Sequence, residues 1–183
     1  MWLLAQWAGT RPPRDLAYHL LLASLADFVV HRYEASVVFV PMERQDLSHS
    51  HAVISHMVSA DRARVLNGCY DPRVILGLME HFDFAVGMRL HFLIFAALSG
   101  VPFLPLPYAG KVYDFAQAAG VPALHGVSRE YIGPLLARLD ELWDRRADQA
   151  ARTSARIEAC KPRAARTVER ALALLTNPPI AVA

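Results

Sequence analysis

The sequence predicts an α/β fold in which a mostly parallel β-sheet is covered by helices. Short apolar runs alternate along the chain with longer segments whose apolar residues recur at helical spacing. Several of the short runs are apolar throughout, which is typical of parallel strands buried on both faces. A final segment, 145–175, is rich in alanine and arginine and contains no glycine, so a long C-terminal helix is expected.

The first elements already alternate between helix and strand. The leucines and alanines of 14–32 recur at helical spacing, which predicts an amphipathic helix. The apolar and β-branched run 36–40 is ended by Pro41 and favours a buried strand. A helical pattern follows over 48–59, and a short strand is expected over 63–66.

The middle of the chain carries clear boundary signals. Asp71 suits an N-cap and Pro72 the first helical position, so a helix begins there. Gly100 lies where a helix C-terminal cap is expected. The elements predicted after the helix at Pro72 are a strand at 84–86, a helix at 88–99 and a strand at 101–106.

The last elements complete the alternation. Gly120 indicates the end of a helix over 111–119. The elements predicted after it are a strand at 121–124, a helix at 128–144 and the long helix at 145–175. Repeated strand–helix–strand units of this spacing predict right-handed crossovers and a parallel sheet.

Composition limits the function classes. The chain has 183 residues and forms one globular domain, and its net charge of +2 is too small to indicate nucleic-acid binding. Cys69 and Cys160 lie far apart, and the first residues lack the basic start of a signal peptide, so a cytoplasmic protein is expected. The uncharged segment 92–110 contains three prolines, which argue against a membrane-spanning helix.

Chemistry is expected at the ends of the strands. In an open parallel sheet, ligands bind outside the carboxyl ends of the strands, and the loops there are 41–46, 67–71, 87–91 and 107–111. These loops would meet at one edge of the sheet and bring polar and aromatic side chains together. The candidate residues are Glu43, Asp46, Tyr70, Arg89, His91, Tyr108 and Lys111.

Arg89 and His91 lie at the start of a predicted helix, where free backbone N–H groups and a partial positive charge attract anions. A guanidinium and an imidazole at this position favour a carboxylate or a phosphate. Arg89 also fits an ion pair with Glu80 or Asp83. His91 equally fits a hydrogen-bonded core histidine, and Lys111 a solvated lysine.

Three histidines in one predicted helix, His49, His51 and His56, raise the question of a metal site. His49 and His56 share a helix face, but no third ligand accompanies them at a fixed spacing, so no metal is expected. The glycine-rich dinucleotide motif, the P-loop and the Gly-x-Ser-x-Gly nucleophile motif do not occur in the sequence. The common dinucleotide and nucleoside-triphosphate folds are thereby disfavoured, and no cofactor is expected.

Several segments resemble the polysaccharide pyruvyl transferase family. The most specific is Met-Arg-Leu-His at 88–91, followed by Gly-Val-Pro at 100–102 and by Tyr108 and Lys111. Asp46 after the strand that ends near residue 42, and Tyr-Asp-Pro at 70–72 before a helix, occur in the same order as in that family. The resemblance covers roughly 16–144. It implies a Rossmann-like domain at 1–146 that resembles one half of a GT-B fold, with a helical extension at 147–183.

The resemblance implies transfer of a pyruvyl group from phosphoenolpyruvate to two hydroxyls of a glycan or lipid-linked sugar. The product is a ketal in cell-envelope or exopolysaccharide biosynthesis. On this reading Arg89 clamps the carboxylate or phosphate, Lys111 neutralises the phosphate and His91 exchanges a proton. The further substrate contacts implied are Glu43 or Asp46, which would orient an acceptor hydroxyl, and Tyr70, Met88 and Tyr108.

Members of that family carry another domain of comparable size, with the cleft between the two. The resemblance therefore implies a partner domain, or a homodimer formed through apolar surface that includes Trp2, Leu3 and Trp7. Two other functions share this fold and stay open. One is a non-catalytic binding subunit, and the other is a glycosyltransferase-like domain that uses a nucleotide sugar.

Overall fold

A parallel sheet forms the centre of the molecule, as the sequence predicts. The structure is a computed structural model that describes residues 2–5, 12–68, 70–121, 123 and 131–176. Within these residues the strands lie in the order β3-β2-β1-β4-β5, and every neighbouring pair is parallel. The strands are β1 (Trp2–Ala5), β2 (Val37–Phe39), β3 (Ala63–Val65), β4 (Phe84–Gly87) and β5 (Phe103–Pro105).

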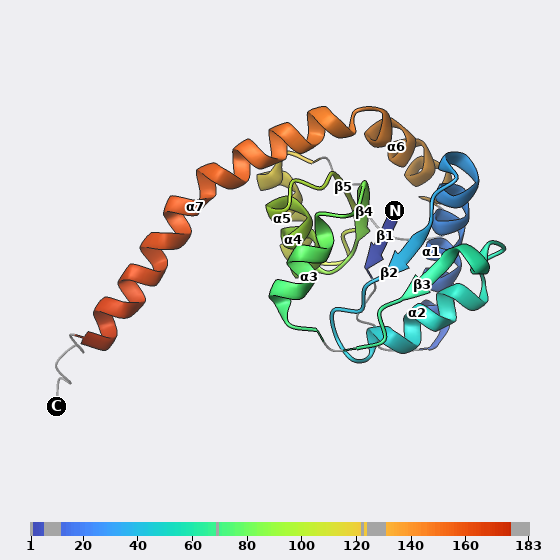
Figure 1. Cartoon of the computed structure of the whole chain (residues 1–183), viewed down its shortest axis with the longest axis horizontal. Helices are drawn as coiled ribbons and strands as arrows, with labels where there is room; N and C mark the ends of the chain where they lie inside the picture. Colours follow the sequence, from blue (N-terminus) through green and yellow to red (C-terminus); the bar gives the residue numbers. More distant parts are fainter. Residues whose placement is uncertain (1, 6–11, 69, 122, 124–130, 177–183) are drawn as a thin grey trace.

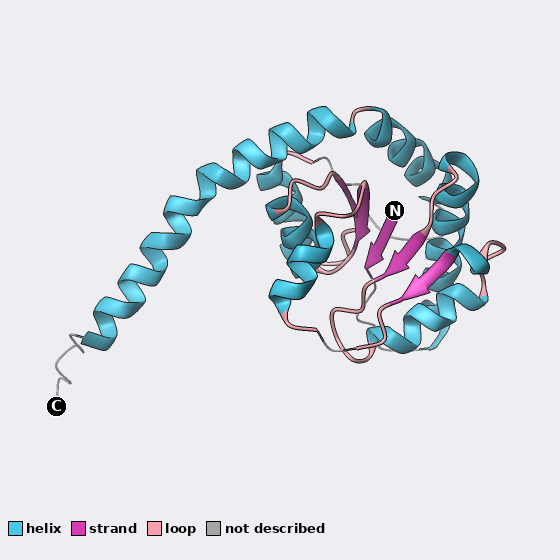
Figure 2. Cartoon of the chain, viewed as in Figure 1, coloured by secondary structure: helices cyan, strands magenta, loops and turns pink. Residues whose placement is uncertain are grey.

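Helices cover both faces of this sheet (Figures 1 and 2). They connect the parallel strands, because a parallel pair requires a crossover that returns the chain to the same end of the sheet. The helices are α1 (Pro12–Tyr33), α2 (Asp46–Ser55), α3 (Pro72–Met79), α4 (Leu90–Leu98), α5 (Gly110–Ala119), α6 (Ile132–Asp144) and α7 (Arg146–Thr176), with a short 3-10 turn, η1 (Ala60–Arg62).

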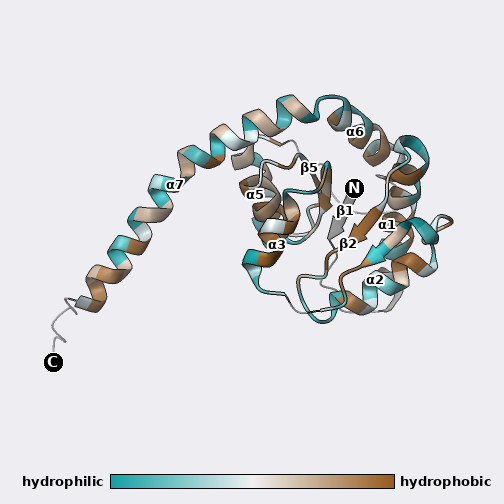
Figure 3. Cartoon of the chain, in the orientation of Figure 1, coloured by the Kyte–Doolittle hydropathy of each residue, from teal (hydrophilic) through white to brown (hydrophobic). Residues whose placement is uncertain are grey.

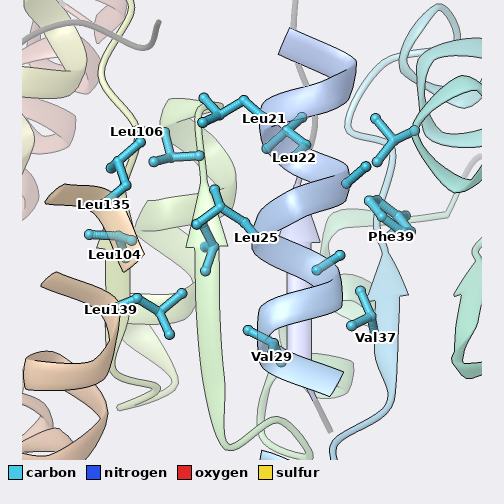
Figure 4. Packing of buried hydrophobic residues seen from close by; sticks show 14 of the residues in the cluster. Leu21, Leu22, Leu25, Val29, Val37, Phe39, Leu104, Leu106, Leu135 and Leu139 are labelled. Atoms are coloured by element: carbon cyan, nitrogen blue, oxygen red, sulfur yellow. The ribbon is translucent and has the colours of Figure 1, made fainter. Parts of the chain in front are cut away.

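The core has two halves, one on each face of the sheet. Successive side chains of a strand point to opposite faces, so Val37 and Phe39 of β2 enter one half and Val38 enters the other. The first half lies against α1, α2 and α6, and the second lies against α3, α4 and α5. Figure 4 shows the first half, to which α1 contributes Leu21, Leu22, Leu25 and Val29 and α6 contributes Leu135 and Leu139.

The central strand β1 is an element that the sequence analysis did not identify. Trp2 pairs with Val37 of β2 on one side and with Phe84 of β4 on the other. Trp2 and Leu3, which the sequence analysis considered for a docking surface, thus lie in the middle strand of the sheet. Trp7 lies outside the described residues.

Several predicted elements differ in the structure. Helix α2 begins at Asp46 and ends at Ser55, whereas 48–59 was expected. Helix α4 begins at Leu90, whereas a start at residue 88 was expected. Arg89 is the N-cap residue, and Met88 lies before it. No strand occupies Val121 or Ala123, and residues 122 and 124 of that predicted strand lie outside the described part.

The predicted capping signals at Asp71, Gly100 and Gly120 are confirmed. The side chain of Asp71 caps α3 by accepting a hydrogen bond of 2.8 Å from the backbone N–H of Arg73. Gly100 and Gly120 follow α4 and α5 with φ angles of 70° and 73°, the left-handed conformation that glycine adopts without steric cost.

The long helix α7 leaves the domain after its first turns. Gln149 Nε2 donates a 2.7 Å hydrogen bond to the Phe103 carbonyl, and Thr153 Oγ1 donates one of 3.4 Å to that of Ala119. Residues 158–176 are exposed, and the end of α7 projects away from the sheet (Figure 1). Hydrophilic and hydrophobic residues are interleaved along it (Figure 3). Within the described residues, no helix combines the length and apolar character needed to cross a membrane.

Candidate functional site

A cavity of about 770 Å³ opens at the carboxyl ends of the strands. The chain runs from β1 to β2 and β3 on one side of the sheet, and then crosses to β4 and β5 on the other. Such a reversal is a topological switch point, where open parallel sheets bind ligands. The volume falls within the range of roughly 300–1,000 Å³ that is usual for small-molecule sites.

All four loops considered in the sequence analysis line this cavity, so the structure brings most of the candidate residues together. Their order around the cavity follows the order of the strands, from β3 at one edge of the sheet to β5 at the other. The candidates that line the cavity are Glu43 after β2, Tyr70 after β3, Arg89 and His91 after β4, and Tyr108 and Lys111 after β5.

Two of the candidates are placed elsewhere. Met88 has no exposed surface and packs in the first half of the core, so a substrate contact through this side chain is not available. Asp46 is also fully buried and does not line the cavity. Asp46 contacts Arg89, which does line the cavity.

Arg89 is held by two carboxylates, each of which it contacts twice. Its Nη1 and Nη2 donate to the two carboxylate oxygens of Glu43 at 2.7 and 3.0 Å. Its Nε and Nη2 donate to the oxygens of Asp46 at 3.2 and 2.6 Å. This double fork joins the loop after β2 to the loop after β4 across the end of β1, which separates these strands in the sheet.

The two carboxylates differ sharply in environment. Half of the Glu43 side chain, 51%, is exposed at the cavity, whereas none of Asp46 is exposed. Asp46 also accepts hydrogen bonds from the backbone N–H groups of Met42 and Glu43, at 3.2 and 3.1 Å, which fixes the loop before α2. Asp46 is the first residue of α2, two residues before the expected start.

Burial raises the pKa of Asp46 above its usual value, while the hydrogen bonds from Arg89 act in the opposite direction. Burial also lowers the pKa of Arg89, but its hydrogen bonds and ion pair with Asp46 outweigh this effect and leave that pKa above the usual value. Arg89 is therefore charged at any physiological pH.

These contacts revise the expectations for Arg89. Its ion-pair partners among the contacts described are Glu43 and Asp46, whereas Glu80 and Asp83 were considered from the sequence. Since both edges of the guanidinium are already engaged by carboxylates, Arg89 in this structure does not present a fork to a substrate anion. Its geometry is that of a residue that positions Glu43.

Other basic side chains face the cavity. Arg44 lies beside Glu43 in the loop after β2, and His91 and Lys111 lie in the first turns of α4 and α5. All three are exposed. Neither helix has a side-chain N-cap hydrogen bond, so the backbone N–H groups of the first turns add to the positive field. The sequence analysis missed Arg44, although its place directly after Glu43 in a strand-end loop was a sufficient signal.

The remaining wall of the cavity is apolar and aromatic. Tyr108 is half-buried and packs against both halves of the core. Leu66, Ile75 and Phe95 also line the cavity, and Tyr70 lies at its edge. The site thus combines cations with apolar surface, as sites for charged organic molecules do.

Two histidines of the predicted helix 48–59 contact a third histidine that the sequence did not suggest. His19 Nε2 of α1 lies 2.9 Å from His49 Nδ1, and the ring of His56 stacks on His19 with centroids 6.4 Å apart. His51 is exposed and is not part of this contact. Across the described residues, no three His, Cys, Asp or Glu side chains are arranged to hold a metal ion.

Comparison with solved structures identifies the fold. A UDP-N-acetylglucosamine 2-epimerase, described as putative, from Listeria monocytogenes matches with a TM-score of 0.55 and 12% identity. The match covers 84% of this chain and 39% of the epimerase. An α,α-trehalose 6-phosphate synthase from Burkholderia multivorans matches with a TM-score of 0.52 and 12% identity, over 98% of this chain and 45% of that one. The fold is that of a GT-B glycosyltransferase lobe.

The family is set by the sequence itself. The model of the polysaccharide pyruvyl transferase family matches residues 11–110, which is more than half of the chain. The chain therefore belongs to the polysaccharide pyruvyl transferase family. No relative is found among curated proteins. The chain spans less than half the length of each solved structure described above.

Proposed function

We propose that this chain is the donor-binding lobe of a polysaccharide pyruvyl transferase that uses phosphoenolpyruvate. The observation that carries the proposal is the cavity at the switch point, which receives exposed cations from loops on both sides of β1. A donor with both a carboxylate and a phosphate requires several cationic contacts. Because the chain spans less than half of its structural neighbours, we propose that a second domain or chain completes the cleft.

The donor phosphate is assigned to the starts of α4 and α5. Lys111 supplies a point charge, His91 supplies a ring N–H, and backbone N–H groups at the starts of both helices supply further donors. Arg44, from the loop on the other side of β1, is assigned to the donor carboxylate. Arg89 keeps Glu43 in place between these cations.

The proposed reaction adds two sugar hydroxyls to the enol carbon C2 of phosphoenolpyruvate. A proton adds to the methylene carbon C3, one sugar oxygen bonds to C2, the C2–O bond to phosphate breaks, and the second sugar oxygen bonds to C2. Of the two hydroxyl protons, one balances the proton gained by the new methyl group and the other leaves with inorganic phosphate. His91 is the proposed acid and base for these transfers, and Glu43 is the proposed acceptor of a hydrogen bond from a sugar hydroxyl. The product is a pyruvylated glycan of the cell envelope or an exopolysaccharide.

Calorimetric titration of the chain with phosphoenolpyruvate tests the donor site. Lys111→Ala and Arg44→Ala should each weaken binding roughly tenfold or more, because a hydrogen bond to a charged group contributes about 1.5–3 kcal/mol. Lys161→Ala, which removes an exposed lysine far along α7, is the matched control and should bind as the unchanged chain does. Equal affinity in all four proteins, or no binding by any, would refute the proposed donor site.

A nucleotide sugar is the second candidate ligand. The trehalose-6-phosphate protein from E. coli, whose structure contains UDP-2-fluoroglucose, matches with a TM-score of 0.51 at 15% identity over 86% of this chain and 40% of that one. The apolar wall of the cavity offers surface for a base. Titration with UDP-glucose distinguishes the two candidate ligands. Binding of UDP-glucose in place of phosphoenolpyruvate favours a glycosyltransferase-like role. Binding of neither ligand favours a non-catalytic subunit.

A further inference from the structure

Tyr70 forms an exposed aromatic edge of the cavity. It lies in the loop between β3 and α3, lines the cavity and is 46% exposed. The next residue, Asp71, caps α3 with its side chain, so the loop is fixed at the point where Tyr70 leaves it. A large side chain that is held at a cavity and remains half exposed offers its surface to a ligand.

The ring of Tyr70 packs against Gly68. A Cβ atom added to Gly68 would lie 3.1 Å from Cζ and 3.3 Å from Oη of Tyr70, closer than ordinary van der Waals contact. Glycine therefore allows the ring to lie over the chain at this point. The contact limits the positions that the ring can adopt, which is what a stacking surface requires.

The order of the strands separates Tyr70 from Lys111, the proposed contact of the donor phosphate. Tyr70 follows β3 and Lys111 follows β5, and these are the two edge strands of the sheet. Glu43, which follows β2, comes next to Tyr70 in this order, before His91, which follows β4. An acceptor bound against Tyr70 would thus reach Glu43 first and then the proposed proton-transfer residue.

We propose that Tyr70, seated on Gly68, is the stacking platform for the acceptor sugar. The inference rests on the proposed function, because it assigns the second substrate of the same site. A pyranose has an apolar C–H face that packs on an aromatic ring and hydroxyls that project from its edge. With that face on Tyr70, the edge hydroxyls point along the cavity toward Glu43, where transfer would occur.

Saturation-transfer NMR with the full chain tests the platform directly. The probes are the methyl α- and β-pyranosides of glucose, galactose and mannose, each added to the unchanged chain and to variants. At least one glycoside should receive saturation on the C–H protons of one ring face. Tyr70→Phe should keep this signal, and Tyr70→Ala should raise the dissociation constant roughly tenfold. Gly68→Ala, which displaces the ring without removing it, should weaken binding as well.

Tyr131→Ala is the matched control, because Tyr131 is 41% exposed and is not part of the cavity wall. This variant should bind the glycoside as the unchanged chain does. Equal affinity of Tyr70→Ala and the unchanged chain for the glycoside, or no binding of any pyranoside, overturns the proposed platform.

Titration of phosphoenolpyruvate into Tyr70→Ala distinguishes this proposal from the proposed function. Normal binding of phosphoenolpyruvate together with lost binding of the glycoside supports both proposals. Glycoside binding that depends on Tyr70 in a chain that never binds phosphoenolpyruvate supports the platform and contradicts only the donor.

Discussion

Replacement of Arg89 by alanine should strongly destabilise the fold, because it leaves the fully buried Asp46 without its counter-ion. Breaking a buried ion pair by removing one partner costs about 3–5 kcal/mol. In a chain of this size that loss corresponds to a fall in Tm of roughly 6–20 °C. Removal of Glu43 should cost less than about 1 kcal/mol, because half of this side chain is in contact with water.

Urea unfolding followed by circular dichroism measures both losses, and an unchanged m value shows that each variant unfolds from the same compact state. A third variant, Arg89→Met with Asp46→Leu, replaces the buried pair by apolar side chains and should regain most of the stability that Arg89→Ala loses. If Glu43→Ala is as destabilising as Arg89→Ala, or if Arg89→Ala costs less than about 1 kcal/mol, the energetic account of this network is wrong.

Two further predictions concern the scaffold. Gly120→Ala should lower the free energy of unfolding in urea by about 1–2 kcal/mol, because Gly120 has a φ of 73°. Gly77→Ala, in the last turn of α3 where an added Cβ meets no atom within 4 Å, should be neutral or stabilising. Equal effects of the two substitutions would contradict this account. The hydrogen bond from Tyr33 lowers the pKa of Asp140 in the folded protein. The stability that this hydrogen bond contributes is therefore fully present above the unfolded pKa of about 3.8, and it is lost as the pH falls through the lower pKa of the folded state. Tyr33→Phe should raise the pKa of Asp140 in an NMR titration and flatten the acid loss of stability, and an unchanged titration would contradict the assignment.

The strands that lie between two helices were predictable from the sequence, and the central strand was not. β2, β4 and β5 are apolar runs with a boundary signal on both sides, such as Pro41 after β2. β1 has only four residues near the start of the chain, so neither length nor periodicity separates it from an unstructured apolar segment. Its parallel neighbours on both sides exist only in the folded sheet.

The missed strand also explains the missed partners of Arg89. Without β1, the nearest carboxylates in sequence are Glu80 and Asp83, and these were the partners considered. With β1 in the centre, the ends of β2 and β4 flank one position, and Glu43 and Asp46 come within reach although they are 46 and 43 residues away in sequence. The convergence of the four loops was predictable, because it depends only on the strands being parallel.

The contacts of Arg89 with Glu43 and Asp46 connect the loop after β2 directly to the loop after β4. β2 and β4 are joined in the sheet only through β1, so no direct ladder connects the loops that follow them. The forked contacts of Arg89 hold these two loops together, at the cost of desolvating a buried pair. Arg89→Lys separates positioning from charge, because an ammonium keeps the charge and loses the fork. This variant should lose less stability than Arg89→Ala but should still bind phosphoenolpyruvate more weakly than the unchanged chain. Full donor affinity in Arg89→Lys would show that the cavity needs only a positive charge at this position.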